Sequence, residues 1–170
     1  MTVGMGFIGG VVALTLVLAA GAQAVGAAPA AALRAATISR VEDGRTLWLD
    51  ARGAAPMRAR LAWIAAPAAP GGKAGGEPHG AEARQHLEVW KGQPVEFRSV
   101  AADRDGTALV EVLWRPTAES VVTLNYEMVR SGFARADCAL SGEFALQCRV
   151  LRKAEEVARQ ERRGMWADHP

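Results

Sequence analysis

The sequence contains no charged residue in its first 33 positions, and it is poor in cysteine, histidine and aromatic residues. Neither cysteine has a second ligand at zinc-finger spacing, and the histidines form no ligand set, which argues against a metal site built from these residues. We expect His79, His86 and His169 to be surface residues. The formal net charge is only +2, which is too weak to indicate a nucleic-acid-binding protein by itself. What remains is one domain of ordinary size.

The N-terminal stretch is a hydrophobic segment that we expect to form a helix. An apolar run over residues 7–20 precedes Ala22-Gln23-Ala24, an A-x-A pattern of the kind that signal peptidase cuts. The residues before the run contain no lysine or arginine, and the apolar stretch extends over 3–24, long enough to span a bilayer. Residues 1–24 are therefore either a cleaved signal peptide or a retained transmembrane anchor.

Either alternative places the rest of the chain outside the cytoplasm. Residues 25–36 are rich in alanine, proline and glycine and predict a flexible tether. The folded domain is then expected over 37–170. Cys138 and Cys148 are the only cysteines and agree with export, because an oxidising compartment favours a disulfide between them. The alternative is two free thiols, one of them buried.

The pattern along the domain predicts an α+β fold. Asp43-Gly44 is a turn signal between two β-type runs, and residues 57–64 alternate with period two. Residues 65–80 are rich in proline and glycine and predict a mobile loop. Five strands with a helix between the third and fourth indicate a five-stranded oligonucleotide/oligosaccharide-binding (OB-fold) barrel with three helices. The expected strands are 36–41, 46–50, 57–64, 94–101 and 108–114, and the expected helices are 81–90, 123–131 and 143–163.

The last predicted helix contains a cluster of basic residues that glutamates interrupt. We interpret it as a solvated helix face with mixed charges rather than a binding patch. The basic residues are Arg149, Arg152, Lys153, Arg159, Arg162 and Arg163, and the glutamates are Glu155, Glu156 and Glu161.

Six segments, in order along the domain, resemble motifs of the staphylococcal nuclease (thermonuclease) family. They are VEDGRTL at 41–47 (family V-x-D-G-D-T-x), RLAWIAAPA at 60–68 (R-L-x-G-I-D-A-P-E), GAEA at 80–83 (G-x-E-A), DRDGTAL at 103–109 (D-x-Y-G-R-x-L), the helix from Leu124-Asn125 to Gly132-Phe133-Ala134 (V-N-x-x-L-V-x-x-G-x-A), and RGMW at 163–166 (R-x-G-x-W). The resemblance covers nearly the whole domain and implies the OB-fold.

The positions that carry chemistry in that family differ here. The resemblance implies two aspartates that help to hold Ca²⁺, a glutamate that handles the attacking water and two arginines that clamp the phosphate. The aspartate positions are Arg45 and Ala65, and the glutamate position is Ala68. The second arginine position is Thr107, so that only the first arginine remains, as Arg60.

These replacements predict the loss of nuclease chemistry. Ca²⁺ requires about six to eight oxygen ligands, with carboxylates supplying most of the charge. Arg45 places a cation where the metal would bind. A missing general base alone costs roughly 10²–10⁴ in rate, and a missing phosphate clamp removes transition-state charge stabilisation. We expect no metal, no cofactor and no catalytic residue, because Asp43 and Asp103 match turn positions at which aspartate accepts backbone hydrogen bonds.

The sequence therefore favours a pseudoenzyme that acts as an accessory or scaffold subunit for a protein partner in the cell envelope, attached to the membrane through residues 3–24 if these are retained. The main alternative is a metal-independent anion- or nucleic-acid-binding module. In that hypothesis Arg45 and Arg60 face each other in the family's cleft, with Arg58 nearby. In the simpler interpretation Arg45 pairs with Glu42 or Asp43 at the surface. A residual calcium-dependent nuclease is the third hypothesis.

Overall fold

The computed structural model describes residues 32–71, 75–139, 142 and 144–168. The predicted hydrophobic helix and most of the predicted tether lie outside these residues. Within the described part of the chain, no helix is long and apolar enough to cross a membrane. Strand β1 begins at Arg34, so residues 34–36 belong to the sheet rather than to the tether, because they pair with residues 95–97 of β5.

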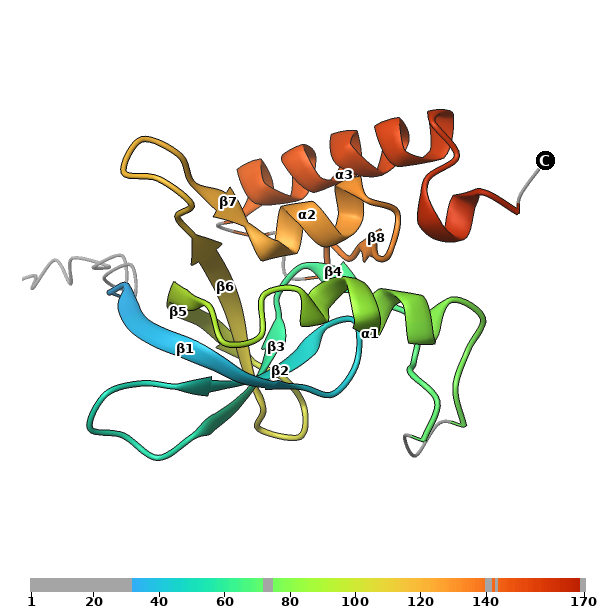
Figure 1. Ribbon diagram of the computed structural model, residues 1–170. Helices are drawn as coiled ribbons and strands as arrows, with labels where there is room; N and C mark the ends of the chain where they lie inside the picture. Colours follow the sequence, from blue (N-terminus) through green and yellow to red (C-terminus); the bar gives the residue numbers. More distant parts are fainter. Residues whose placement is uncertain (1–31, 72–74, 140–141, 143, 169–170) are drawn as a thin grey trace, which may run out of the picture.

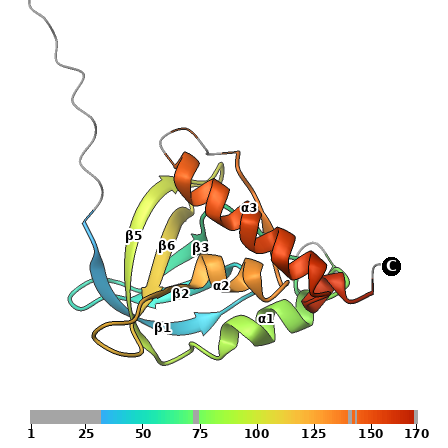
Figure 2. The ribbon, with the colours of Figure 1, turned by 90° about the horizontal axis from the view of Figure 1, so that it is seen from above.

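Five strands of the described chain form a closed barrel (Figures 1 and 2). They are β1 (Arg34–Val41), β2 (Thr46–Asp50), β3 (Met57–Leu61), β5 (Pro94–Ala102) and β6 (Ala108–Trp114). Their order is β3-β2-β1-β5-β6, and a parallel pairing of β3 with β6 closes the circle. The neighbouring pairs are otherwise antiparallel. This mixed barrel with its helices confirms the predicted OB-fold.

Alternating side chains fill the barrel. Leu47 and Leu49 of β2 are fully buried, as are Ala59 and Leu61 of the neighbouring strand β3. Trp48, between the two leucines, is only half-buried, since successive side chains of a strand point to opposite faces. The arginines of β3 share that outer face with Trp48, because the register pairs residue 48 with 58 and residue 46 with 60. The alternation of side chains along β2 and β3 therefore places the apolar ones in the core and the arginines on the outer surface.

The predicted strand 57–64 is interrupted. It divides into β3 and the two-residue strand β4 (Ile64–Ala65), which pairs with β8 (Arg135–Ala136). The break falls at Trp63, whose φ of 61° is in the left-handed region. A bulky residue rarely adopts this conformation, and Trp63 is nevertheless 4% exposed. Residues 61–64 are all apolar and all buried, so the sequence there does not show where the strand ends.

Three α-helices of the described chain lie on one side of the barrel, each shorter than predicted (Figure 1). They are α1 (Gly80–Glu88), α2 (Leu124–Arg130) and α3 (Ala145–Gln160), and a short 3₁₀ helix, η1 (Gly164–Trp166), follows α3. Helix α2 contacts β6 on one side and α3 on the other. A two-residue strand, β7 (Val122–Thr123), leads into α2. Gly132 ends α2 with φ of 77°, as predicted, and a Cβ there would lie 2.1 Å from the carbonyl oxygen of Arg163.

Asn125 connects α2 to the barrel. Its side chain is 2% exposed. Its Oδ1 accepts a hydrogen bond from Val112 N at 3.1 Å, and its Nδ2 donates to the carbonyl oxygens of Ala62 at 2.9 Å and Val110 at 3.0 Å. All three are backbone groups, and the carbonyl oxygen of Val110 also accepts from Ala62 N at 2.8 Å. One buried amide therefore fixes the position of the helix layer.

The disulfide prediction is confirmed, and the two described histidines are less exposed than predicted. Cys138 and Cys148 are joined with a Cα–Cα distance of 5.6 Å, which ties the segment after β8 to the first turn of α3. His86 is not a surface residue. It is half-buried, 4.6 Å from the Phe133 ring and 5.7 Å from the Trp90 ring, because it lies where α1 meets the segment after α2. His79 is also half-buried, and His169 lies outside the described residues.

Candidate functional site

The turn between β1 and β2 is built around Asp43. Its Oδ1 accepts hydrogen bonds from the backbone N–H groups of Arg45 at 2.8 Å and Thr46 at 2.7 Å. An aspartate that satisfies two backbone donors in this way holds a tight turn in place. Asp43 therefore has the structural role that the sequence predicts. Gly44 is required next to it, because a Cβ at this position would lie 2.7 Å from the Cβ of Ala83.

Arg58 is bound to Glu42, a residue that the sequence analysis did not assign to it. Nη2 of Arg58 lies 2.8 Å from Oε2 of Glu42, whose Oε1 accepts a hydrogen bond from the indole of Trp48 at 2.7 Å. The hydrogen bond from Arg58 lowers the pKa of Glu42, and the hydrogen bond to Glu42 raises the pKa of Arg58. Arg58 Nη1 also donates to Thr107 Oγ1 at 3.3 Å. Arg58 is therefore held in place by its neighbours.

Arg60, at the position where the family resemblance implies a phosphate clamp, is bound to two aspartates. Its Nη1 lies 2.5 Å from Oδ2 of Asp103, and its Nη2 lies 3.0 Å from Oδ2 of Asp105. A backbone hydrogen bond from Arg104, and then the bond from Arg60, lower the pKa of Asp103. A backbone hydrogen bond from Thr107 is the largest cause that lowers the pKa of Asp105 to about 2. Both carboxylates are therefore ionised at neutral pH, and both hold the Arg60 guanidinium.

Arg45 differs from the other two arginines. Its side chain is half-buried, and within the described residues it has no carboxylate partner. The pairing with Glu42 or Asp43 that we considered is not observed, because Arg58 takes Glu42 and the backbone takes Asp43. Arg58 and Arg60 both lie on β3. No bond joins Arg45 to either of them among the described residues.

Across this surface the charges compensate one another. Its arginines are Arg45, Arg58 and Arg60, and its carboxylates are Glu42, Asp43, Asp103 and Asp105. Ion pairs hold two of the three arginines. A phosphate would have to displace a carboxylate before it could bind Arg58 or Arg60. These ion pairs could not be predicted from the sequence, because the partners of Arg60 come from the β5–β6 turn, and Asp103 is 43 residues away in the chain.

Calcium, the metal that the family resemblance implies, does not fit the residues present. The two ligand positions are occupied by a guanidinium at Arg45 and a methyl group at Ala65. The nearest carboxylates are bound elsewhere, Asp43 to backbone N–H groups and Asp103 to Arg60. In the described part of the chain, no group of three or more histidine, cysteine, aspartate or glutamate residues is arranged to hold a metal ion. A hard cation would find too few free oxygen ligands here.

Ala68, at the position where the family resemblance implies the general base, is hydrogen-bonded to a glutamate from elsewhere in the chain. Ala68 N donates to Oε2 of Glu77 at 2.7 Å, and Ala68 O accepts from Glu77 N at 2.8 Å. Glu77 is thus the closest carboxylate to this position, and its Oε2 already binds the backbone of the loop. Glu77 lies nine positions after Ala68 and outside the family motif, so the motif alone did not point to it.

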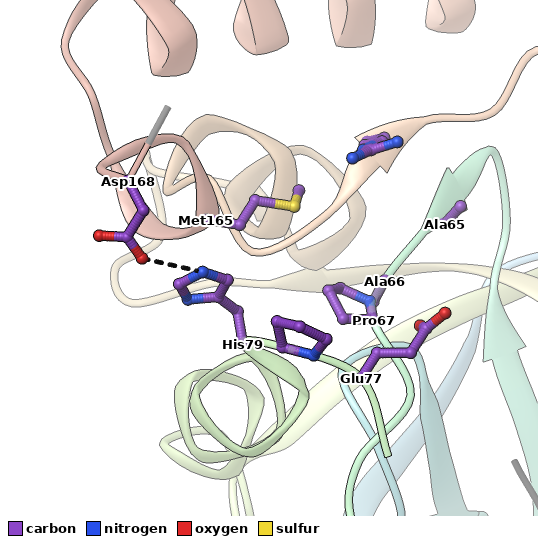
Figure 3. Close-up of a pocket in the computed structure, with 9 residues that line it drawn as sticks. Ala65, Ala66, Pro67, Glu77, His79, Met165 and Asp168 are labelled. Atoms are coloured by element: carbon purple, nitrogen blue, oxygen red, sulfur yellow. Dashed lines mark ion pairs between the residues drawn. The ribbon is translucent and has the colours of Figure 1, made fainter. Parts of the chain in front are cut away.

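A cavity of about 640 Å³ lies beside Ala65 (Figure 3). Much of its lining is small or apolar and includes Ala66, Pro67 and Met165. On its far side His79 points toward Asp168, with Nε2 3.2 Å from Oδ2 (Figure 3). An alanine therefore faces an apolar hollow where the family has a metal-binding carboxylate. The charged and polar residues of the lining are Glu77, His79, Arg135 and Asp168.

Two comparisons with known proteins bear on this geometry. The sequence model of the family described as staphylococcal nuclease homologue matches residues 58–168. The match begins in β3 and ends after η1, so it covers most of the barrel and the whole helix layer. The turn containing Arg45 precedes the matched range, and its assignment depends on the strand pairing described above. A comparison with curated proteins finds no match.

Proposed function

The chain belongs to the staphylococcal nuclease homologue family, and from this premise we propose that it is a non-catalytic member, an accessory or scaffold subunit that binds a protein partner outside the cytoplasm. The barrel and helices of the family are kept. The proposal concerns what this scaffold does once its nuclease residues have been replaced.

The observation that carries the proposal is the capture of Arg60 by Asp103 and Asp105. In a phosphodiesterase this guanidinium has to stabilise charge that develops on the phosphate. Here two ionised carboxylates occupy its donors. Ala65 and Ala68 supply no metal ligand and no base. Because these deficits affect the metal, the base and the clamp together, no single local rearrangement restores the reaction.

Two features support a location outside the cytoplasm. The disulfide between Cys138 and Cys148 fits an oxidising compartment. The uncharged apolar sequence over residues 3–24 fits an export signal or a membrane anchor. A tether of about ten residues between such an anchor and β1 would keep the barrel near the membrane surface.

Fractionation and co-purification of the full-length chain test this proposal. A C-terminally tagged chain expressed from its own locus is expected in the membrane fraction. It should co-purify with a stoichiometric protein partner after mild detergent extraction. N-terminal sequencing of the purified chain shows whether residues 1–24 are retained. A lone monomer in the soluble extracytoplasmic fraction, with no partner at any salt concentration, contradicts the proposal.

The second candidate is a metal-independent anion- or nucleic-acid-binding module, and the observation that favours it is that Arg45 has no carboxylate partner among the residues that the structure describes. It is the weaker candidate because Arg58 and Arg60 are already bound to carboxylates. Titration with single-stranded DNA at low salt separates the two candidates. Binding that disappears in Arg45→Ala supports the module, and binding that is absent or unchanged in that variant removes it.

A further inference from the structure

A second hollow lies between the β7–α2 segment and the first half of α3. These elements lie next to one another in Figures 1 and 2. The hollow has a volume of about 210 Å³, and we call it the α2–α3 groove. Its lining residues are Trp63, Glu111, Thr123, Asn125, Tyr126, Leu146, Gln147, Val150 and Leu151. None of them belongs to the surface that replaces the nuclease site.

Trp63 gives the groove an aromatic wall that the family motif does not predict. Trp63 occupies the position at which the family motif R-L-x-G-I has glycine, and its φ of 61° is one that glycine adopts easily and tryptophan rarely does. The ring is 4% exposed and packs against Phe144 with centroids 4.9 Å apart. Its Nε1 has no hydrogen-bond partner among the described residues. An unfavourable backbone conformation at a bulky residue points to a functional constraint at this place.

The rim of the groove is apolar and exposed. Leu146 is 60% exposed and Val150 is 45% exposed, whereas Cys148, Leu151 and Ala154 of the same helix face the core. Leu146 and Val150 are one turn apart and therefore adjacent on the helix surface. A large apolar rim around a partly hollow centre is typical of a protein-binding site, in which a buried anchor residue carries most of the affinity.

The charges beside this rim have one sign. Arg149 lies three residues after Leu146, so it borders the rim, and Arg152 lies one turn further round the helix. Both are exposed, and neither has an ion-pair partner among the described residues. In contrast, Lys153 and Arg159 pair with glutamates of the same helix. The carboxylate inside the groove, Glu111, is bound to Arg98 at 2.6 Å. Arg149 is therefore a cation beside the rim with no ion-pair partner among the described residues, whereas Arg152 lies near Glu155 and Glu156.

We propose that the α2–α3 groove binds a segment of a partner protein that inserts one aromatic or branched aliphatic side chain beside Trp63 and places acidic residues against Arg149. A cavity of about 150 Å³ is sufficient for a benzene ring, so the groove holds one such side chain. Charge complementarity selects an acidic segment. This inference depends on the proposed function, because it names the surface through which the accessory subunit binds its partner.

Two fluorescein-labelled peptides test the groove on the full-length chain in detergent. Both carry a single phenylalanine, flanked by glutamates in one peptide and by lysines in the other. Fluorescence anisotropy should show that the acidic peptide binds at least about tenfold more tightly. Val150→Asp at the rim should weaken its binding by at least about tenfold. Val89→Asp is the matched control, since Val89 is 63% exposed at the end of α1 and away from the groove, and it should leave binding unchanged.

Several outcomes overturn the inference. Equal binding of the two peptides, no binding of either, or unchanged binding to Val150→Asp each contradict it. Two other occupants are tested in parallel, with vesicles of anionic phospholipid and with sedimentation of the protein alone. If Val150→Asp abolishes vesicle binding or self-association and the acidic peptide does not bind the wild type, the groove contacts a membrane or a second copy, and the inference is wrong.

The failure of this inference is distinguishable from the failure of the proposed function. If a partner co-purifies with the wild-type chain and equally with Val150→Asp, the accessory role stands and the groove is not its binding surface. If no partner co-purifies with the wild-type chain, the accessory role itself fails. Thermal melting of Val150→Asp should match that of the wild type, because the replaced side chain is exposed.

Discussion

Arg60 and Asp103 form an ion pair in which Nη1 lies 2.5 Å from Oδ2, and Asp105 binds the other end of the same guanidinium. Arg60 comes from β3, and the two aspartates come from the turn between β5 and β6. The parallel pairing of β3 with β6 brings these segments together. The closure of the barrel therefore places two carboxylates of the protein itself, those of Asp103 and Asp105, beside the guanidinium of Arg60.

Removing these anions should uncover an anion site. The double variant Asp103→Asn/Asp105→Asn keeps side-chain oxygens for the turn and removes both negative charges beside Arg60. Exposed ion pairs contribute about 1 kcal/mol each or less. We therefore expect single-stranded DNA affinity at low salt to rise by about tenfold, measured by fluorescence anisotropy. The same changes combined with Arg60→Ala should give no gain. A gain that persists without Arg60 contradicts this explanation.

His86 should make the protein less stable at mildly acidic pH. Burial lowers the pKa of His86, and only Glu127 opposes this effect. Because the folded-state pKa lies below the unfolded value of about 6.5, the unfolded chain binds more protons once the pH falls below that value. Stability should therefore decrease from neutral pH toward pH 5. Urea midpoints of wild type and His86→Phe at both pH values measure this contribution, and equal pH dependence in the two proteins contradicts it.

The disulfide should contribute a substantial part of the stability. It closes a loop with a sequence separation of 10, which corresponds to about 3 kcal/mol in the chain-entropy model. Cys138→Ala/Cys148→Ala should therefore lower the melting temperature by about 10 °C. Dithiothreitol should destabilise the wild type to a similar extent and leave the double variant unaffected. An unchanged melting temperature in the double variant would show that the loop is held by other contacts.

Trp63→Gly separates backbone strain from side-chain packing. Glycine relieves the left-handed conformation, a gain of about 1–3 kcal/mol. Loss of the buried indole costs about 3–5 kcal/mol by comparison with tryptophan-to-alanine changes. The net result should be a destabilisation of about 2 kcal/mol in chemical denaturation. If the variant is instead more stable than the wild type, the ring packs too weakly to form the wall of a binding groove.

The sequence predicts the barrel well and the surface less well, and the difference has a physical cause. Alternation in β2 and β3, the Asp43-Gly44 turn and the Gly132 stop are local signals, and all are confirmed. The break at Trp63 has no such signal, because it depends on how β4 pairs with β8. His86 was wrongly predicted to be exposed, since its burial results from Phe133, which is distant in sequence.

The same distinction applies to the candidate site. Arg45, Ala65, Ala68 and Thr107 could be read from motif positions. The partners of the arginines could not, because Arg58 pairs with a residue 16 positions earlier and Arg60 with residues more than 40 positions later. Side-chain pairing across strands follows from the three-dimensional register. The structure therefore adds that Arg60, which the motif comparison gave as a retained arginine, is a member of an ion-pair network with Asp103 and Asp105.

The most direct test of the central claim is a combined calcium titration and cleavage assay on the full-length chain. Calorimetry measures Ca²⁺ binding, and fluorescent single-stranded DNA reports cleavage with Ca²⁺ and with a chelator. An active member of the family serves as the positive control. We expect no calcium binding attributable to the barrel and no cleavage above the chelator control. Calcium-dependent cleavage that disappears in Arg60→Ala would show that the nuclease chemistry persists, against this expectation.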